Sequence, residues 1–152
     1  MLELIHYSEL ESGDFSLWLE MGLKLWKDSN KEDLKVEFED ILKSKIHHSF
    51  LAKNEKNAGI GFVNISIRKE YVTGSKSCPT GYIEGIYVEL AYRNKGVARK
   101  LIELSESWFL EKGCKQIGSD TWDWNKESQE FHERIGFVKK ATLVHFLKDI
   151  KV

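Results

Sequence analysis

The spacing of hydrophobic residues predicts two helices in the first third of the chain. From Ser8 to about Trp26 the apolar residues recur with imperfect helical spacing. Between Leu34 and Leu42 they recur at i, i+4, i+7 and i+8, as on one face of an amphipathic helix. The other face of this second helix carries the acidic residues Glu32, Asp33, Glu37, Glu39 and Asp40.

Strands are predicted next, because β-branched and aromatic residues replace the helical pattern. Residues 49–53 form a short, partly apolar run, and residues 82–88 are rich in strand-forming side chains. Within residues 60–67 the apolar positions change phase after Phe62, which predicts a bulge or bend. Residues 70–80 contain glycine, serine and the lone proline, and are expected to form a loop.

The second half of the chain alternates helices with strands. Residues 93–96 form a predicted turn, and residues 97–112 a helix that Gly113 is well placed to close. A strand at 115–121, a helix at 126–134 and a final strand at 137–148 complete the order ααβββαβαβ. This order indicates a mixed α/β fold and allows parallel strands around the 97–112 helix.

Length and composition indicate one globular domain, residues 1–152. The chain is 41% hydrophobic and 31% charged, which excludes disordered and collagen-like classes. No run approaches the ~18 apolar residues of a membrane span. The start of the chain lacks a basic region followed by a long apolar stretch, so we expect no signal peptide and no membrane association.

Charge and cysteine content exclude several partners. The chain has 23 basic and 24 acidic side chains, a balance that argues against nucleic acid as a partner. Cys78 and Cys114 form no CxxC motif and no Cys/His cluster, so neither a disulfide framework nor a metal site is expected. The cytoplasm is the expected compartment.

The stretch from Arg93 to Arg99 is the most informative. It leads from a predicted strand through a basic, glycine-containing turn into a helix. Amide groups at a helix N-terminus bind phosphate, because they have no partner in the helix and the helix dipole favours an anion. Gly96 allows close backbone approach, and Arg93, Lys95 and Arg99 add positive charge. A basic surface turn without a ligand is the alternative.

In its context this stretch resembles the GNAT superfamily of acyl-CoA-dependent N-acetyltransferases. The resemblance rests on Arg-x-x-Gly-x-Ala at 93–98, Asn125 and His132-x-x-x-Gly136-Phe137. Within the superfamily the chain resembles aminoglycoside 6′-N-acetyltransferases, from about Trp18 to the end. The segments that carry this narrower resemblance are Leu25-Trp26, Ser66–Gly74, Glu84–Val88 and Gly118–Thr121.

The resemblance implies the GNAT fold, a homodimer and acetyl-CoA as co-substrate. The fold has a mostly antiparallel central sheet with one splayed parallel strand pair, flanked by helices. The turn would hold the pyrophosphate, the strand backbone the pantetheine arm, and Asn125 a further hydrogen bond, although Asn125 also suits a helix cap. The implied cofactor-binding residues are Ile86, Tyr87, Val88, Arg93, Asn94, Lys95, Gly96, Val97, Ala98, Arg99 and Asn125.

Acetyl transfer to an amine requires a proton acceptor, because most amines are protonated in neutral solution. Glu84, an acidic residue in an otherwise apolar strand, is the candidate base, and an outward-facing glutamate is the alternative. His132 occupies the position where many superfamily members carry a tyrosine that protonates the departing thiolate. Packing against Gly136-Phe137 is its alternative role.

The resemblance also implies substrate contacts. It places Trp26 and Tyr71 against the sugar rings, and a role in the hydrophobic core is the alternative for both. It places Asp120 against the substrate amines, and a turn or capping role is the alternative. Some family members have a substrate-binding glutamate in the last strand, whereas residues 138–142 here have no carboxylate.

The predicted reaction is direct acetyl transfer from acetyl-CoA to the 6′-amine of aminoglycoside antibiotics. No covalent enzyme intermediate is expected, since neither cysteine has a recognisable His/Asp partner. Two alternatives stay open. One is a GNAT enzyme for another small amine or a peptide amino terminus, and the other is a non-catalytic acetyl-CoA-binding module.

Overall fold

A computed structural model describes residues 3–151, and in it the chain forms two compact units, Met1–Ser119 and Asp120–Val152. The second unit contains one helix, α4 (Lys126–Arg134). The first unit contains, in order, β1 (His6–Glu9), α1 (Phe15–Leu25), α2 (Lys31–Lys43), β2 (His47–Lys53), β3 (Gly59–Arg68), β4 (Thr80–Val88), the short 3₁₀ helix η1 (Leu90–Tyr92), α3 (Val97–Glu111) and β5 (Ile117–Gly118).

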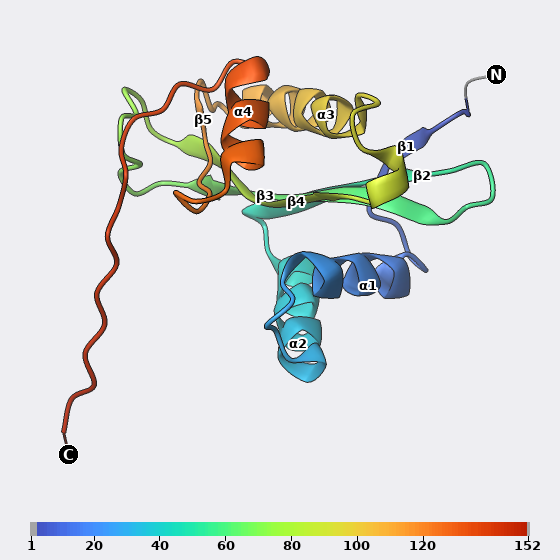
Figure 1. Ribbon diagram of the computed structural model, residues 1–152, viewed down its shortest axis with the longest axis horizontal. Helices are drawn as coiled ribbons and strands as arrows, with labels where there is room; N and C mark the ends of the chain where they lie inside the picture. The colour runs from blue at the N-terminus through green and yellow to red at the C-terminus, as the bar shows by residue number, and fades with distance from the viewer. Residues whose placement is uncertain (1–2, 152) are drawn as a thin grey trace. The chain divides into compact units, whose positions relative to one another are not determined.

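The strands of the first unit form one sheet in the order β1-β2-β3-β4-β5. All neighbouring strands are antiparallel except β4 and β5, which run parallel. Helices α1 and α2 cover one face of the sheet and α3 covers the other (Figure 1). The predicted mixed α/β fold, with a mostly antiparallel sheet and one parallel pair, is confirmed.

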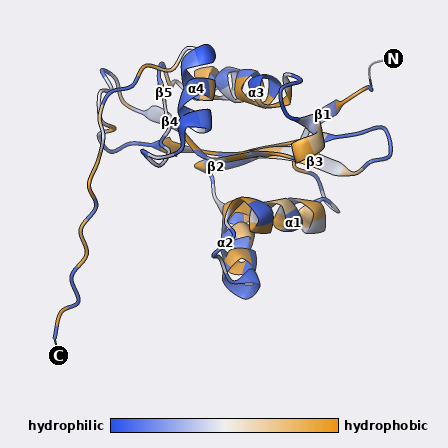
Figure 2. Ribbon diagram, viewed as in Figure 1, coloured by the Kyte–Doolittle hydropathy of each residue, from blue (hydrophilic) through white to orange (hydrophobic). Residues whose placement is uncertain are grey.

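The core on the α1 and α2 side is built on stacked aromatic rings. Trp18 of α1 and Phe38 of α2 are fully buried and stack with 4.0 Å between ring centroids. Leu51 and Phe62 close this cluster from the sheet, and the middle of the sheet is correspondingly apolar in Figure 2. The apolar spacing of the predicted 34–42 helix therefore corresponds to the buried face of α2.

The first helix begins later than predicted, at Phe15 rather than near Ser8. The residues before it form β1, which pairs antiparallel with β2, His6 opposite Lys53 and Glu9 opposite Phe50. The prediction was wrong here because pairing with a strand some forty residues away leaves no signal in the local spacing of apolar residues.

The phase change in β3 also has a different cause from the one predicted. Residues 60–66 are all buried, because β3 is central and both faces of the sheet are covered. An extra residue does exist in β3, but it is Ile60: Ala52 pairs with Gly61 and Lys53 with Gly59. Burial on two faces, and not a bulge after Phe62, removes the alternation.

The predicted helices at 97–112 and 126–134 are confirmed within one residue, by α3 and α4. Gly113 follows α3 in the left-handed conformation, as expected. The strand expected at 115–121 is reduced to Ile117–Gly118.

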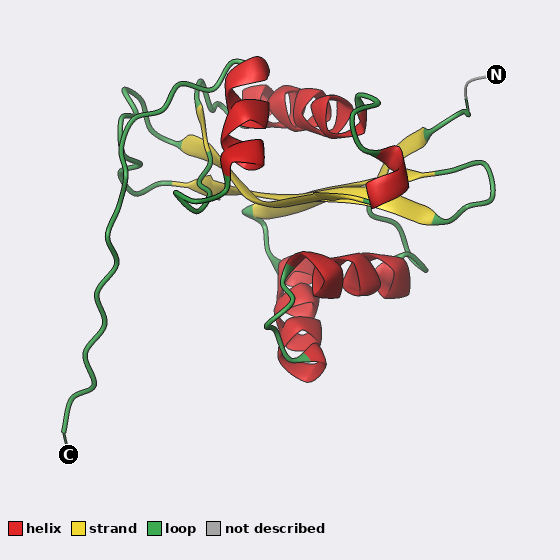
Figure 3. Cartoon of the chain, viewed as in Figure 1, coloured by secondary structure: helices red, strands yellow, loops and turns green. Residues whose placement is uncertain are grey.

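The final strand predicted at 137–148 is absent, since no strand is assigned in the described residues after α4 (Figure 3). The side chains of Leu143, Phe146 and Leu147 are 86–90% exposed. The segment contains apolar residues such as Leu143 and Phe146, but a strand forms only when a neighbouring strand supplies its hydrogen-bond partners. Within residues 3–151 no helix has the length and apolar character needed to cross a membrane.

A buried ion pair joins the start of α1 to β2 and predicts an acid-sensitive contribution to stability. Asp14 accepts hydrogen bonds from Lys53 Nζ and from the amide of Glu11. Burial raises the pKa of Asp14, but the two hydrogen bonds and the Lys53 charge outweigh it, so the pKa lies below its ordinary 3.8.

We expect Asp14→Asn to lower the free energy of unfolding by about 1–3 kcal/mol at neutral pH. A carboxyl group with a lowered pKa stabilises the fold above its unfolded value near 3.8 and loses this effect as pH falls through the folded value. The difference between the two proteins should therefore vanish in acid. Urea unfolding across pH would measure it, and a pH-independent difference would contradict the assignment.

Candidate active site

The site begins with an irregularity in β4 at Glu84. Asn64 of β3 pairs with Gly85 and the next residue, Ile65, pairs with Ile83, so Glu84 is an extra residue without a partner in the ladder. Such a bulge shifts the alternation of side chains by one position.

The shift is visible in the two glycines that flank the bulge. A Cβ atom on Gly81 would lie 2.6 Å from the Phe109 ring of α3, whereas one on Gly85 would lie 2.5 Å from the Trp26 ring beside α1. In a regular strand, residues four apart face the same side. The bulge therefore brings Gly85 and the end of α1 together, and the absence of a side chain lets Trp26 lie against the strand.

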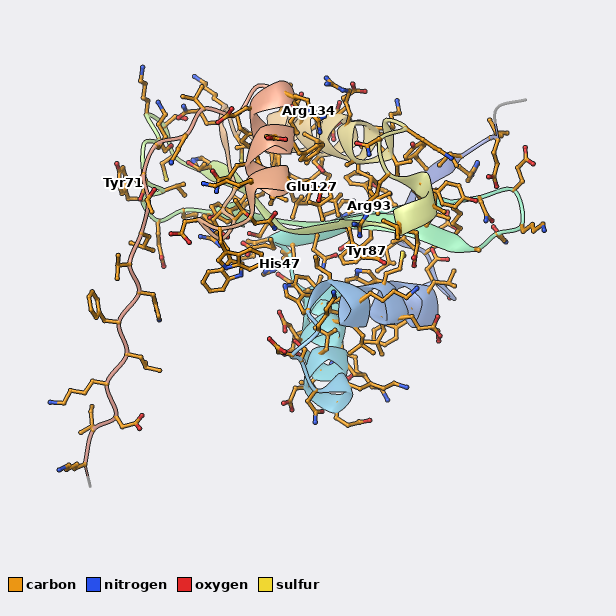
Figure 4. The ribbon with its side chains drawn as sticks, viewed as in Figure 1. His47, Tyr71, Tyr87, Arg93, Glu127 and Arg134 are labelled. Carbon is orange, nitrogen blue, oxygen red and sulfur yellow. The ribbon has the colours of Figure 1, made fainter. Side chains whose placement is uncertain are left out.

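A pocket of about 510 Å³ opens beside the bulge, between α2 and the sheet. Three carboxylates line it, from Glu37 and Asp40 on α2 and from Glu84 on β4. The remaining lining residues are Trp26, Ser29, Leu34, Ile41, Ser44, His47 and Asn64. Figure 4 shows His47 where β2 begins, next to α2. The pocket combines an aromatic and aliphatic wall with negatively charged hydrogen-bond acceptors. This combination suits a cationic ligand.

The Glu84 carboxylate is held by donors from the neighbouring strand. Its Oε1 accepts hydrogen bonds from Ser66 Oγ at 2.7 Å and from Arg68 Nη2 at 2.9 Å. Oε2 accepts a further one from Arg68 Nη2 at 3.1 Å, and the Arg68 guanidinium lies over the Tyr82 ring. The Glu84 side chain is still 32% exposed. It is therefore oriented and accessible, and not simply an outward-facing strand residue.

The two predicted aromatic contacts are placed differently. Trp26 is half-buried, packs edge-on against Phe38 at 6.2 Å and also lines the pocket, so it serves both the core and the pocket. Tyr71 lies in the loop after β3, is 80% exposed and does not line the pocket (Figure 4). Its hydroxyl accepts a hydrogen bond from the amide of Gly74 at 3.1 Å.

The basic turn has the geometry of an anion site. Asn94 and Gly96 have positive φ angles of 60° and 86°, and α3 begins at Val97 directly after them. Among the described residues, no atom outside residues 95–97 lies within 4 Å of the position that a Cβ on Gly96 would occupy. Amides in the first turn of a helix lack partners within it. The turn therefore offers an open glycine and a helix N-terminus, which fit a pyrophosphate.

Arg93 has a role that the sequence did not indicate. Its Nε donates a hydrogen bond to the carbonyl oxygen of Val88 at 2.8 Å, which ties the turn to the end of β4. Parallel pairing between β4 and β5 is confined to Gly81 and Tyr82. In the described part of the chain, the β4 edge at residues 86–88 therefore has no partner strand on the β5 side. This open edge fits a ligand that carries amide groups.

The other predicted residues belong to the second unit. Asn125 caps α4, with its Oδ1 accepting from the amide of Ser128 at 3.2 Å, and Asp120 is exposed. His132 Nδ1 lies 2.7 Å from the carbonyl oxygen of Ser128. Because a carbonyl only accepts, Nδ1 carries the hydrogen, and a proton on Nε2 requires the imidazolium form.

Local sequence patterns assigned no role to three polar residues of this region. Arg68, His47 and Asn64 all lie on strands, and their relation to Glu84 depends on strand register that local patterns do not contain. Among residues 3–151 no cluster of three or more His, Cys, Asp or Glu side chains suitable for a metal ion is found.

Comparison with known proteins agrees with this geometry. The acetyltransferase (GNAT) family matches residues 9–137. An aminoglycoside N(6′)-acetyltransferase type 1 from Acinetobacter haemolyticus is 38% identical over 88% of this chain and 90% of the relative. Its counterpart from Serratia marcescens is 33% identical over 88% of this chain and 91% of the relative.

A solved structure adds a ligand to this comparison. An aminoglycoside 6′-N-acetyltransferase in complex with the bisubstrate analogue CoA-S-monomethyl-acetylneamine is 30% identical and has a TM-score of 0.91. The match covers 97% of this chain and 99% of that one. This chain belongs to the GNAT family of acetyltransferases, and within it to the group of aminoglycoside 6′-N-acetyltransferases.

Proposed function

We propose that the protein transfers the acetyl group of acetyl-CoA to the 6′-amine of aminoglycosides and thereby inactivates them. The observation that carries the proposal is the bulge, which points the Glu84 carboxylate into a pocket with two further carboxylates and an aromatic wall. Aminoglycosides are polycations built of sugar rings, so they match both properties of this pocket.

Glu84 is the proposed base. Its carboxylate takes the proton of the substrate ammonium, directly or through water, and leaves a neutral amine whose lone pair attacks the acetyl carbonyl. Ser66 and Arg68 position the carboxylate, because each donates to it from β3. Trp26 provides the apolar wall for a sugar ring.

Acetyl-CoA supplies an activated thioester. Residues 93–99 would hold its pyrophosphate through amides and positive charge, and backbone groups of Ile86 and Val88 on the open edge would pair with its amides. Asn125 and His132 are proposed as further cofactor and proton-donating residues, and Tyr71 and Asp120 as further substrate contacts. These four roles follow from the resemblance to the family. A homodimer is proposed on the same ground. One catalytic domain spanning residues 1–152 and a cytoplasmic location are proposed from the length, composition and cysteine content of the chain.

A panel of amines tests the reaction directly. Thiol release from acetyl-CoA should accelerate with aminoglycosides that carry a 6′-amine and not with those that carry a 6′-hydroxyl. Equal turnover on both sets would refute the 6′ assignment. Faster turnover of a polyamine or a peptide amino terminus would favour another small amine, and binding of acetyl-CoA without thiol release for any amine would favour a non-catalytic module.

The acidic face of α2 provides a matched pair of variants. Glu37 lines the pocket, whereas Glu39, two residues further on the same helix, does not. We expect Glu37→Gln to raise the Kd for an aminoglycoside roughly threefold at low salt, within the range of exposed ion pairs, mainly through a slower on-rate. The increase in Kd should shrink as salt rises, and Glu39→Gln should raise the Kd less than Glu37→Gln does. Stopped-flow binding at two salt concentrations measures both, and equal effects would argue for a diffuse field instead.

A further inference from the structure

The floor of the pocket contains a buried amide whose orientation is fixed. Asn64 of β3 is 2% exposed and lines the pocket. Its Oδ1 accepts hydrogen bonds from Trp18 Nε1 and from Ser49 Oγ, both at 2.8 Å. Because an indole nitrogen only donates, the atom that it contacts is the oxygen, and Nδ2 must be the atom on the other side.

The Nδ2 group of Asn64 is left as a donor. No acceptor for it is found among residues 3–151, although both hydrogen bonds to Oδ1 are formed. In the same part of the chain, the fully buried side-chain polar atom that lacks a partner is Ser77 Oγ, and Asn64 Nδ2 is not among such atoms. Since Nδ2 has no acceptor, it is not fully buried. Asn64 Nδ2 is therefore open to the pocket, and a ligand that fills the pocket must supply an acceptor or leave the amide unsatisfied.

The position of this donor relates it to the reacting group. Asn64 pairs with Gly85, the residue after Glu84. Ser66, two residues along the same face of β3, donates to Glu84 Oε1. A carboxylate of the pocket can accept a hydrogen bond from an ammonium group, whereas Asn64 Nδ2 can donate one to a neutral oxygen. A ligand that satisfies both carries amines and oxygens side by side.

We propose that Asn64 Nδ2 donates a hydrogen bond to an oxygen of the sugar ring that bears the reacting amine, either the ring ether or a hydroxyl. The inference rests on the proposed function and deepens it. It makes Asn64 a specificity residue that favours amino sugars over aliphatic polyamines, which offer amines but no oxygen. Binding a substrate without the oxygen leaves the buried amide without a partner.

Two variants separate this role from the structural one. Asn64→Asp keeps an oxygen for Trp18 and Ser49 and replaces the donor with an acceptor. Its added negative charge alone would strengthen binding of a polycation, opposite to the effect of losing the donor. Asn64→Ala removes both atoms. Each is assayed for kcat/KM with a 6′-amino aminoglycoside and with its 3′,4′-dideoxy counterpart, alongside KM for acetyl-CoA and the unfolding midpoint.

If the partner is the ring oxygen, both variants should lose about tenfold in kcat/KM on both acceptors, because an ether has no hydrogen to donate to the carboxylate that Asn64→Asp introduces. If the partner is a hydroxyl, wild type should show about tenfold higher kcat/KM on the hydroxylated acceptor than on the dideoxy one. Asn64→Ala should abolish this preference. Asn64→Asp should only reduce it, since a hydroxyl can rotate to donate to the new carboxylate. In both cases KM for acetyl-CoA should stay within about twofold of wild type.

The inference is overturned if wild type treats the two acceptors alike and Asn64→Asp keeps its kcat/KM on both, or if Asn64→Asp leaves a wild-type preference unchanged. These readings need only the aspartate variant, and so they hold if Asn64→Ala does not fold. If the KM for acetyl-CoA rose as much as kcat/KM for the aminoglycosides fell, Asn64 would have a purely structural role. A wild-type protein that acetylates no aminoglycoside refutes the proposed function and this inference with it, whereas an active wild type with indifferent variants refutes the inference alone.

Discussion

Turnover of aminoglycosides should fall by a factor on the order of 10²–10⁴ when Glu84 is replaced by glutamine. Glutamine keeps the length of the side chain and one oxygen that can accept from Ser66 and Arg68, although the bond from Arg68 Nη2 to Oε2 is lost. What is lost is the capacity to take a proton from the substrate ammonium. Steady-state kcat and its pH dependence measure this loss.

Glu89 provides the control for Glu84→Gln. It follows the same strand and is also ion-paired, with Lys24 Nζ at 2.6 Å, but it does not line the pocket. Glu89→Gln should retain turnover. A loss in Glu84→Gln that disappeared at high pH would mean that the amine arrives deprotonated from solution and that Glu84 only binds it. Wild-type turnover with an unaltered pH profile would remove Glu84 from the mechanism.

Replacing Gly96 by valine should raise the KM for acetyl-CoA at least tenfold, on the order of the loss of a charge-assisted hydrogen bond, while changing the aminoglycoside KM much less. In the described part of the chain no atom beyond the adjacent residues lies within 4 Å of the new Cβ, so the added side chain enters the space through which a pyrophosphate would approach the amides. The left-handed φ of 86° also adds backbone strain, about 1–2 kcal/mol for a residue with a Cβ.

Gly113 separates strain from ligand exclusion. It has the same φ of 86° and equally open surroundings, but it lies at the other end of α3. Gly113→Val should therefore share the loss of stability and leave the KM for acetyl-CoA unchanged. If both variants bound acetyl-CoA as wild type does, the phosphate site would lie elsewhere.

Elements with local signals could be predicted from the sequence. The amphipathic spacing of α2 and the glycines on both sides of α3 are contained in a few consecutive residues, and so is the basic turn. Elements that depend on a distant partner could not be predicted. Residues 6–9 form β1 because they pair with β2, and residues 137–148 form no strand despite their apolar residues.

The same distinction applies to the site. Glu84 stood out because it is a carboxylate in an apolar strand, whereas Trp26 was indicated only by the resemblance to the family. The contacts of Arg68 with Glu84 and of Asn64 with Trp18 join segments 16 and 46 residues apart. They depend on strand register and on an extra residue in β4 that the periodicity does not reveal. Physical reading of the sequence therefore found the charged group but not the residues that orient it.

The extra residue in β4 also determines which kinds of sequence change this chain can tolerate. A substitution at Glu84 alters one side chain, whereas deleting one residue between Ile83 and Gly85 would restore a regular ladder with β3. Ile83 would stay opposite Ile65 and Gly85 opposite Asn64, so every later position of the strand would keep its face and Gly85 would stay against Trp26. The extra residue is therefore separable from the fold, because its loss removes one carboxylate of the pocket and leaves the sheet paired with the same faces.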